Sequence, residues 1–189
     1  MIAVLVAAVV SGKAISVSGA YTPIMVPAGL FVVAGVAIMT TFTETSPSTL
    51  WIPSLVLLGI GSGSAVSAPF IAAQSTLAAS DLSVGMAFMT FSQDIGEALF
   101  ISIAQTIFLN QLTRIIEENT PTVNPATAIN AGATYVRQLV PADELPAVLL
   151  SYNTAVKSTF YLAVSLAGSV VVASLMIKKN PFSMAREMK

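Results

Sequence analysis

The sequence predicts an all-α membrane protein, and three observations support that fold class. Hydrophobic residues make up 55% of the 189 residues and charged residues only 9%, against roughly 25% charged residues in an average soluble domain. The charges leave several apolar windows of about 20 residues, the length that a membrane-spanning helix needs. These windows are too long, and too uniformly apolar, to be the alternating strands of a membrane barrel.

The first apolar segment, residues 1–10, is about half a span long. Lys13 follows it instead of preceding it, which is the wrong order for a secretory signal peptide. We interpret the segment as the end of a truncated first span, with a loop over residues 11–22 after it. This interpretation predicts further sequence upstream of Met1.

Full spans are expected wherever charges are absent over a long stretch. No charge lies between Lys13 and Glu44, or between Glu44 and Asp81. We expect four full membrane helices in addition to the truncated one. Their predicted bounds are 23–42, 51–73, 84–112 and 157–178.

The order of these segments predicts the domain organisation. The truncated span and three helices form a membrane block over 1–112, and an extracellular or lumenal segment over 113–156 separates it from the last helix. A tail over 179–189 ends the chain with Arg186 and Lys189. Because basic residues favour the cytoplasmic side of a membrane, we expect the C-terminus to be cytoplasmic.

The outer segment is expected to contain a short amphipathic helix over about 125–140, lying on the membrane surface. Asn124 followed by Pro125 is typical of a helix N-cap and first position. Apolar residues then recur at helical spacing. They are Ile129, Ala133, Val136 and Val140.

The composition excludes several classes of function. The chain has no Cys and no His, and its formal net charge is -1. Zinc sites of the usual kind, thiol chemistry and His-based acid–base catalysis are therefore excluded. A nucleic-acid partner would require a basic surface. We expect no cofactor, no metal and no enzymatic activity.

Small residues are dense in the second full span. Glycines occupy positions 59, 61 and 63. Their spacing lacks the third glycine of the G-x-G-x-x-G pattern, and the lysine of phosphate-binding loops is also absent. In lipid, such residues allow helix backbones to approach closely, so we interpret them mainly as packing positions, with Gly96 as another. A hinge is the alternative, because Pro69 follows in the same helix. The packing and hinge residues are Gly59, Gly61, Gly63, Pro69 and Gly96.

Two carboxylates, Asp94 and Glu97, lie near the middle of an otherwise apolar span. An ionised carboxylate at the bilayer centre costs at least about 2.5 kcal/mol, so such residues usually face a bundle interior or a water-filled path. Residues three or four apart share a helix face, which groups both acids with Gln93. Two acids this close should not both ionise readily, a property that suits a proton carrier. We expect these three residues to line a substrate or proton pathway; the alternative is polar contacts that hold helices together. Gln105 is expected to bond to a neighbouring helix.

At these residues the sequence resembles a known family over nearly its whole length. The matching stretches are Ser11-Gly12-Lys13, Gly19-Ala20-Tyr21-Thr22-Pro23, Leu58-Gly59-Ile60-Gly61-Ser62-Gly63, Pro69 to Gln74, Phe91-Ser92-Gln93 with Gly96, and Ala98 to Gln105. Ala131 to Thr134 and Tyr152-Asn153 also fit. Their order and spacing resemble the C-terminal part of fungal drug and toxin efflux pumps of the major facilitator superfamily, in the fourteen-span drug:proton antiporter branch. The family more often has uncharged residues at positions 94 and 97, so the case for those two acids rests on the physical argument.

The resemblance implies a partial C-terminal helix bundle of four full spans plus a truncated first span. It implies proton-coupled efflux of small apolar organic compounds such as drugs, toxins or secondary metabolites, in the plasma membrane or a vacuolar membrane. The expected partners are the lipid bilayer, the substrate, protons and the missing N-terminal half of the transporter. We expect the isolated chain to be inactive in transport. The alternative is a non-transporting membrane protein that assembles with other helices.

Overall fold

The fold consists entirely of helices over the residues that the structure describes. This computed structural model describes residues 1–18, 22–43, 46–120 and 122–176, and no strand occurs among them. The six helices are α1 (Ile2–Ser18), α2 (Thr22–Thr40), α3 (Ser48–Thr76), α4 (Leu82–Asn119), α5 (Pro125–Leu139) and α6 (Leu145–Met176). The predicted all-α class is confirmed. The predicted tail over 179–189 lies outside the described residues.

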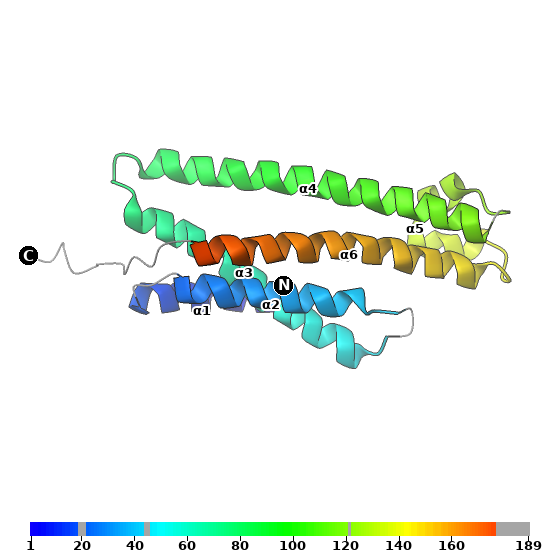
Figure 1. The fold of residues 1–189 in the computed structure, drawn as a ribbon, viewed down its shortest axis with the longest axis horizontal. Helices are drawn as coiled ribbons and strands as arrows, with labels where there is room; N and C mark the ends of the chain where they lie inside the picture. Colours follow the sequence, from blue (N-terminus) through cyan, green and yellow to red (C-terminus); the bar gives the residue numbers. More distant parts are fainter. Residues whose placement is uncertain (19–21, 44–45, 121, 177–189) are drawn as a thin grey trace, which may run out of the picture.

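The helices form a bundle in which long elements run side by side (Figure 1). α3 crosses behind the others and contacts both α1 and α2, while α2 also contacts α6. α6 in turn contacts α4, and α5 lies at the end of the molecule where α4 and α6 are joined. α4 therefore forms one edge of the bundle and α1 lies toward the other.

Within the residues that the structure describes, four helices are long and apolar enough to cross a membrane, which is the pattern of a multi-pass integral membrane protein. The apolar segments are Pro23–Thr40, Ser48–Gln74, Leu82–Asn119 and Leu145–Met176. α4 has 38 residues and α6 has 32, which at a rise of 1.5 Å per residue gives lengths of about 57 and about 48 Å. Both exceed the hydrocarbon thickness of about 30 Å. Each helix therefore continues beyond the bilayer core.

The predicted loop over residues 11–22 is wrong for most of its length, because α1 continues to Ser18. Lys13 is the only charge in this stretch, and Lys is a good helix former. The Ser11 hydroxyl donates to the Ala8 carbonyl oxygen at 3.1 Å, so it stays within the helix. A single lysine therefore does not end this helix.

Close backbone approach joins α3 to its two neighbours. A Cβ atom added at Gly61 would lie 2.6 Å from the Val32 nitrogen and 2.7 Å from the Ala28 carbonyl oxygen, both on α2. On the other side of α3, a Cβ at Gly63 would overlap the Val4 carbonyl oxygen of α1. A residue with a side chain does not fit at either position without movement of a helix backbone.

A small apolar core closes the end of the bundle where α4, α5 and α6 meet. Its members are Leu112, Ile116, Ala128, Val136, Val148, Tyr152 and Ala155. The Tyr152 hydroxyl donates to the Ala128 carbonyl oxygen at 2.6 Å, and its ring lies 6.2 Å from that of Phe108. These contacts tie α5 to α6 and α6 to α4.

α5 differs from the surface helix that its amphipathic pattern predicts. Its apolar side packs on α4 and α6, with Val136 fully buried and Ile129 and Val140 packed around the core. The helix is interrupted at Gly132, where φ is 69°, a conformation that glycine adopts without steric cost. Asn124 caps its start by accepting from the Ala126 nitrogen at 2.9 Å. The side chain of Ala133 lies outside the described part.

Candidate functional site

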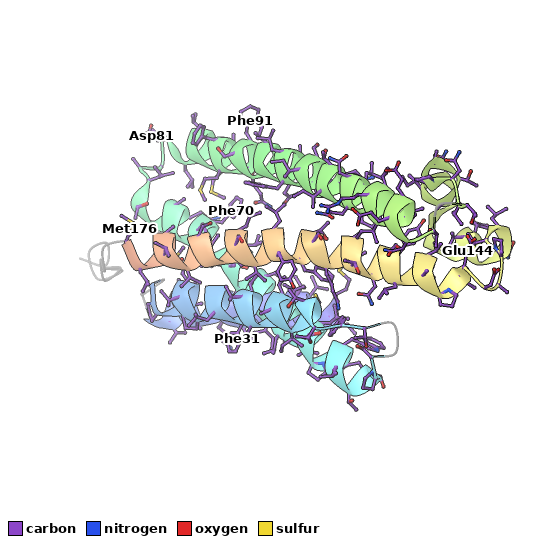
Figure 2. The ribbon with its side chains drawn as sticks, turned by 45° about the vertical axis from the view of Figure 1, so that its right-hand side comes forward. Phe31, Phe70, Asp81, Phe91, Glu144 and Met176 are labelled. Atoms are coloured by element: carbon purple, nitrogen blue, oxygen red, sulfur yellow. The ribbon has the colours of Figure 1, made fainter. Side chains whose placement is uncertain are left out.

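The middle of α4 has three distinct sides, and the first faces the bundle. Met89, Gly96 and Ala104 are partly buried on this side. Phe91 lies on the opposite side and is 62% exposed. Figure 2 shows Phe91 pointing away from α6 at the outer edge of the molecule.

An exposed apolar stripe runs along one flank of α4. Its members recur every three or four residues, so they share one face of the helix. They are Val84, Phe88, Phe91, Ile95 and Leu99, all exposed. An exposed apolar stripe of this length is the surface that a helix turns toward lipid or toward another apolar helix.

The other flank of α4 carries the two acids. Asp94 and Glu97 are both exposed, and so are Thr90 and Gln105. The same spacing rule places these four positions on one side, where Ile101 is the large apolar exception. We call this surface, formed by Thr90, Asp94, Glu97, Ile101 and Gln105, the carboxylate side.

The predicted group of three polar residues is brought together only in part. The Gln93 side-chain nitrogen donates to Glu97 Oε1 at 3.0 Å, so one acid already has an amide partner on its own helix. Asp94 has no hydrogen-bond or ion-pair partner among the residues that the structure describes. The one ion pair in that part of the chain joins Arg114 and Glu118, well along α4 from the acids.

The position of the acids along α4 corresponds to the depth of a bilayer centre. Asp94 lies twelve residues after Leu82, where the helix begins, which is about 18 Å along the axis. The predicted span begins at residue 84. If the bilayer begins there, both acids lie near the middle of a hydrocarbon core about 30 Å thick.

The predicted packing positions differ in their surroundings. Gly59, Gly61 and Gly63 each face a neighbouring helix so closely that an added Cβ would lie within 3 Å of it. An added Cβ at Gly96 would have no atom within 4 Å. Pro69 lies inside α3.

Gln105, expected to bond to a neighbouring helix, lies on the same flank of α4 as the two acids. It follows Asp94 by eleven residues, which is three helical turns, so the two side chains lie on the same side of α4. The spacing of eleven residues from Asp94 is the sequence signal that groups Gln105 with the acids.

No cluster of three or more His, Cys, Asp or Glu side chains that could hold a metal ion occurs in the described ranges. The carboxylate side offers two acids, one amide and a hydroxyl along one exposed flank. Such a surface can accept protons or hydrogen bonds.

Comparison with known proteins relates this bundle to transporters. The chain is 37% identical over 178 residues to the efflux pump roqT of Penicillium rubens, covering 94% of this chain and 33% of the pump. It is 36% identical over 178 residues to the MFS-type transporter astH of Aspergillus oryzae, covering 94% of this chain and 32% of that protein. It is 39% identical over 167 residues to the MFS-type transporter pigP of Monascus ruber, covering 88% and 29%.

The chain thus spans about one third of the length of the curated relatives that it matches. No protein-family profile matches the chain, and no solved structure does.

Proposed function

We propose that this chain forms the C-terminal helices of a proton-coupled exporter of small organic compounds. The proposal rests on its homology to fungal MFS-type efflux pumps and transporters, of which it matches about one third of the length. The remaining helices of such a transporter would complete the pathway. The expected cargo is a small apolar compound, since all but one side of the site is apolar. The membrane would be the plasma or vacuolar membrane, with the C-terminus in the cytoplasm.

The observation that carries this proposal is the carboxylate side of α4. Two acids lie on one exposed flank of an apolar helix, beside an apolar stripe that suits lipid. An ionised acid at the centre of a bilayer costs about 2.5 kcal/mol on the lowest scale and more on others. Turning the apolar stripe outward places Asp94 and Glu97 toward the interior of a complete transporter, where water and cargo would pass. There the acids would take up and release the coupling proton.

The glycines of α3 would support this role by fixing the helices behind the pathway. Gly59 and Gly63 hold α1, while Gly61 holds α2. In transporters of this kind, alternating access is a rocking of rigid bundles about a central site. A block of helices in backbone contact is suited to move as one body. Pro69 would be the hinge position at which α3 bends during that movement.

The experiment replaces the homologous third of roqT with this chain and follows gradient-driven efflux of rhodamine 6G from yeast vesicles. The double variant Asp94→Asn with Glu97→Gln should insert normally but lose stimulation by an imposed pH gradient. Exchange of rhodamine 6G in the absence of a gradient should persist. The matched control is Asp81→Asn, because Asp81 lies in the turn before α4.

Unchanged proton coupling in the double variant would overturn the proposed role of the two acids. The single variants compare the two acids in their effect on proton coupling. Asp94→Asn should have the larger effect, because Glu97 already accepts a hydrogen bond from the Gln93 amide. The chain reconstituted alone in lipid vesicles should show no efflux of rhodamine 6G. Gradient-driven efflux from those vesicles would contradict the need for further helices.

A further inference from the structure

An apolar groove lies between α1 and α2 and is floored by α3. Its volume is about 740 Å³, within the range of about 300–1,000 Å³ that small-molecule sites occupy. Val6 and Val10 form one wall, Ile24 and Phe31 form the other, and Ile60 lies in the floor. Its polar lining consists of Ser11 and Ser64, and the Ser11 hydroxyl already donates to its own helix.

The groove is open along its length. Val6 is 56% exposed, Val10 is 61% exposed and Phe31 is 41% exposed, and Figure 2 shows Phe31 at the lower edge of the bundle. In a bilayer, an open apolar groove is filled by hydrocarbon, because an empty one would forfeit dispersion contacts on every wall. The hydrocarbon of the bilayer can therefore fill the groove.

The length of the groove matches one leaflet of a bilayer. Its lining residues on α1 extend from Ile2 to Ala14, which is about 18 Å at 1.5 Å per residue. A hydrocarbon core about 30 Å thick has leaflets about 15 Å deep. A single lipid tail lying along α1 would therefore fill the groove from one end to the other.

A positive charge marks one end of the groove. Lys13 is not part of the lining, but it directly precedes Ala14, the last α1 residue that lines the groove. It is exposed, and it makes no ion pair with any residue in the described ranges. A lysine at this depth extends its ammonium group toward the headgroup layer while its methylenes stay in hydrocarbon.

We propose that the groove between α1 and α2 binds one acyl chain of an anionic phospholipid, such as a phosphatidylserine, whose headgroup pairs with Lys13. The apolar walls take the tail, and the ammonium group takes the phosphate and the headgroup carboxylate. The positive charge at the end of the groove distinguishes this occupant from an apolar helix, which would leave Lys13 without a counter-charge. The site is independent of the transport proposal.

Photo-crosslinking in reconstituted vesicles tests the site. The 189-residue chain is placed in phosphatidylcholine vesicles that contain a trace of either phosphatidylserine or phosphatidylcholine with a diazirine in its tail. Labelled peptides are then identified by mass spectrometry. Phosphatidylserine should label the α1 and α2 walls about fivefold more than phosphatidylcholine does, the preference that one lysine gives near an anionic headgroup. Peptides from the apolar stripe of α4 serve as the internal reference and should be labelled equally.

Variants separate the headgroup contact from the tail contact. Lys13→Gln should reduce labelling by phosphatidylserine to the phosphatidylcholine level, and Lys13→Arg should restore it. Lys157→Gln should change nothing, because Lys157 lies on α6, which contributes no residue to the groove. Val10→Trp should fill the groove and reduce labelling by both lipids, with helical circular dichroism unchanged.

Two results would overturn the proposal. Equal labelling of the groove by both lipids with Lys13 intact would remove the anionic headgroup. Labelling on the α4 stripe without any on the groove walls would show that lipid does not enter and that another helix covers them.

Discussion

Helices α3 and α4 both have the length and apolarity to cross a membrane, yet their surroundings differ. Of the membrane-spanning window of α3, 28% is buried within the bundle, compared with 11% for α4. The glycines show the same contrast. Gly61 and Gly63 on α3 lie against neighbouring backbones, while a Cβ at Gly96 on α4 would meet nothing within 4 Å.

The contrast separates two uses of a membrane helix. α3 has its neighbours in place, so its small residues are explained by contacts within this chain. Most of the surface of α4 is uncovered except at its far end, where Leu112 and Ile116 are fully buried. α4 is therefore anchored at one end, and under the proposed function the acids along its uncovered middle would line the pathway.

Adding a methyl group at Gly61 tests the close packing of α3 most directly. In Gly61→Ala the new Cβ would lie 2.6 Å from the Val32 nitrogen, so α2 and α3 must separate. Overpacking of this kind costs about 1–3 kcal/mol. Unfolding of the chain in detergent micelles, followed by circular dichroism during titration with SDS, should show the loss. A variant as stable as the native chain would contradict the close approach of the two helices.

The anchored end of α4 is tested by Tyr152→Phe. The change removes the hydrogen bond from the Tyr152 hydroxyl to the Ala128 carbonyl oxygen but keeps the ring, and it should cost about 1 kcal/mol. Hydrogen exchange should become faster in α5, while exchange in α3 stays unchanged. Tyr161→Phe is the control, since Tyr161 is exposed. Equal exchange in both variants would mean that the bond does not hold α5 in place.

Gly96→Ala should change the stability of the chain in the opposite direction to Gly61→Ala. With nothing within 4 Å of the new Cβ, the effect is limited to helix propensity, which favours Ala over Gly by about 0.5–1 kcal/mol. The same SDS titration should show a small gain in stability for the isolated chain. A loss would indicate a close neighbour of α4 in the micelle, for instance a second copy of the chain.

The smallest effect is expected at the ion pair on the exposed surface of α4. Arg114 and Glu118 are joined at 2.8 Å, but both side chains are mostly exposed. Exposed pairs contribute little because water and salt screen them. Arg114→Gln should leave the unfolding midpoint unchanged within error at physiological salt. A clear shift would show that this end of α4 is more enclosed than its exposure indicates.

Much of the fold follows from where the charges are absent. The windows between Lys13, Glu44 and Asp81 contain the apolar parts of α2 and α3. Charge is a poor marker of helix ends, however. α4 continues through Arg114 and Glu118 to Asn119, because these residues favour helices even where they exclude a membrane.

The candidate site was predictable where it depends on one helix and unpredictable where it depends on several. The spacing of four between Gln93 and Glu97 is enough to bring them within hydrogen-bond distance, and they lie 3.0 Å apart. Which side of α4 faces its neighbours depends on how α6 packs, and a single helix carries no such information. For the same reason the groove between α1 and α2 has no signature in the sequence beyond scattered valines and isoleucines.

The excess length of α4 and α6 has a mechanical consequence. The two helices are antiparallel, both continue past the bilayer, and their projecting ends share a core that includes Leu112, Ile116 and Val148, all fully buried. This shared core resists sliding of one helix along the other, because sliding would expose its apolar residues to water. Any tilt of α4 must therefore be transmitted to α6. The hairpin would thus move as a single rigid unit.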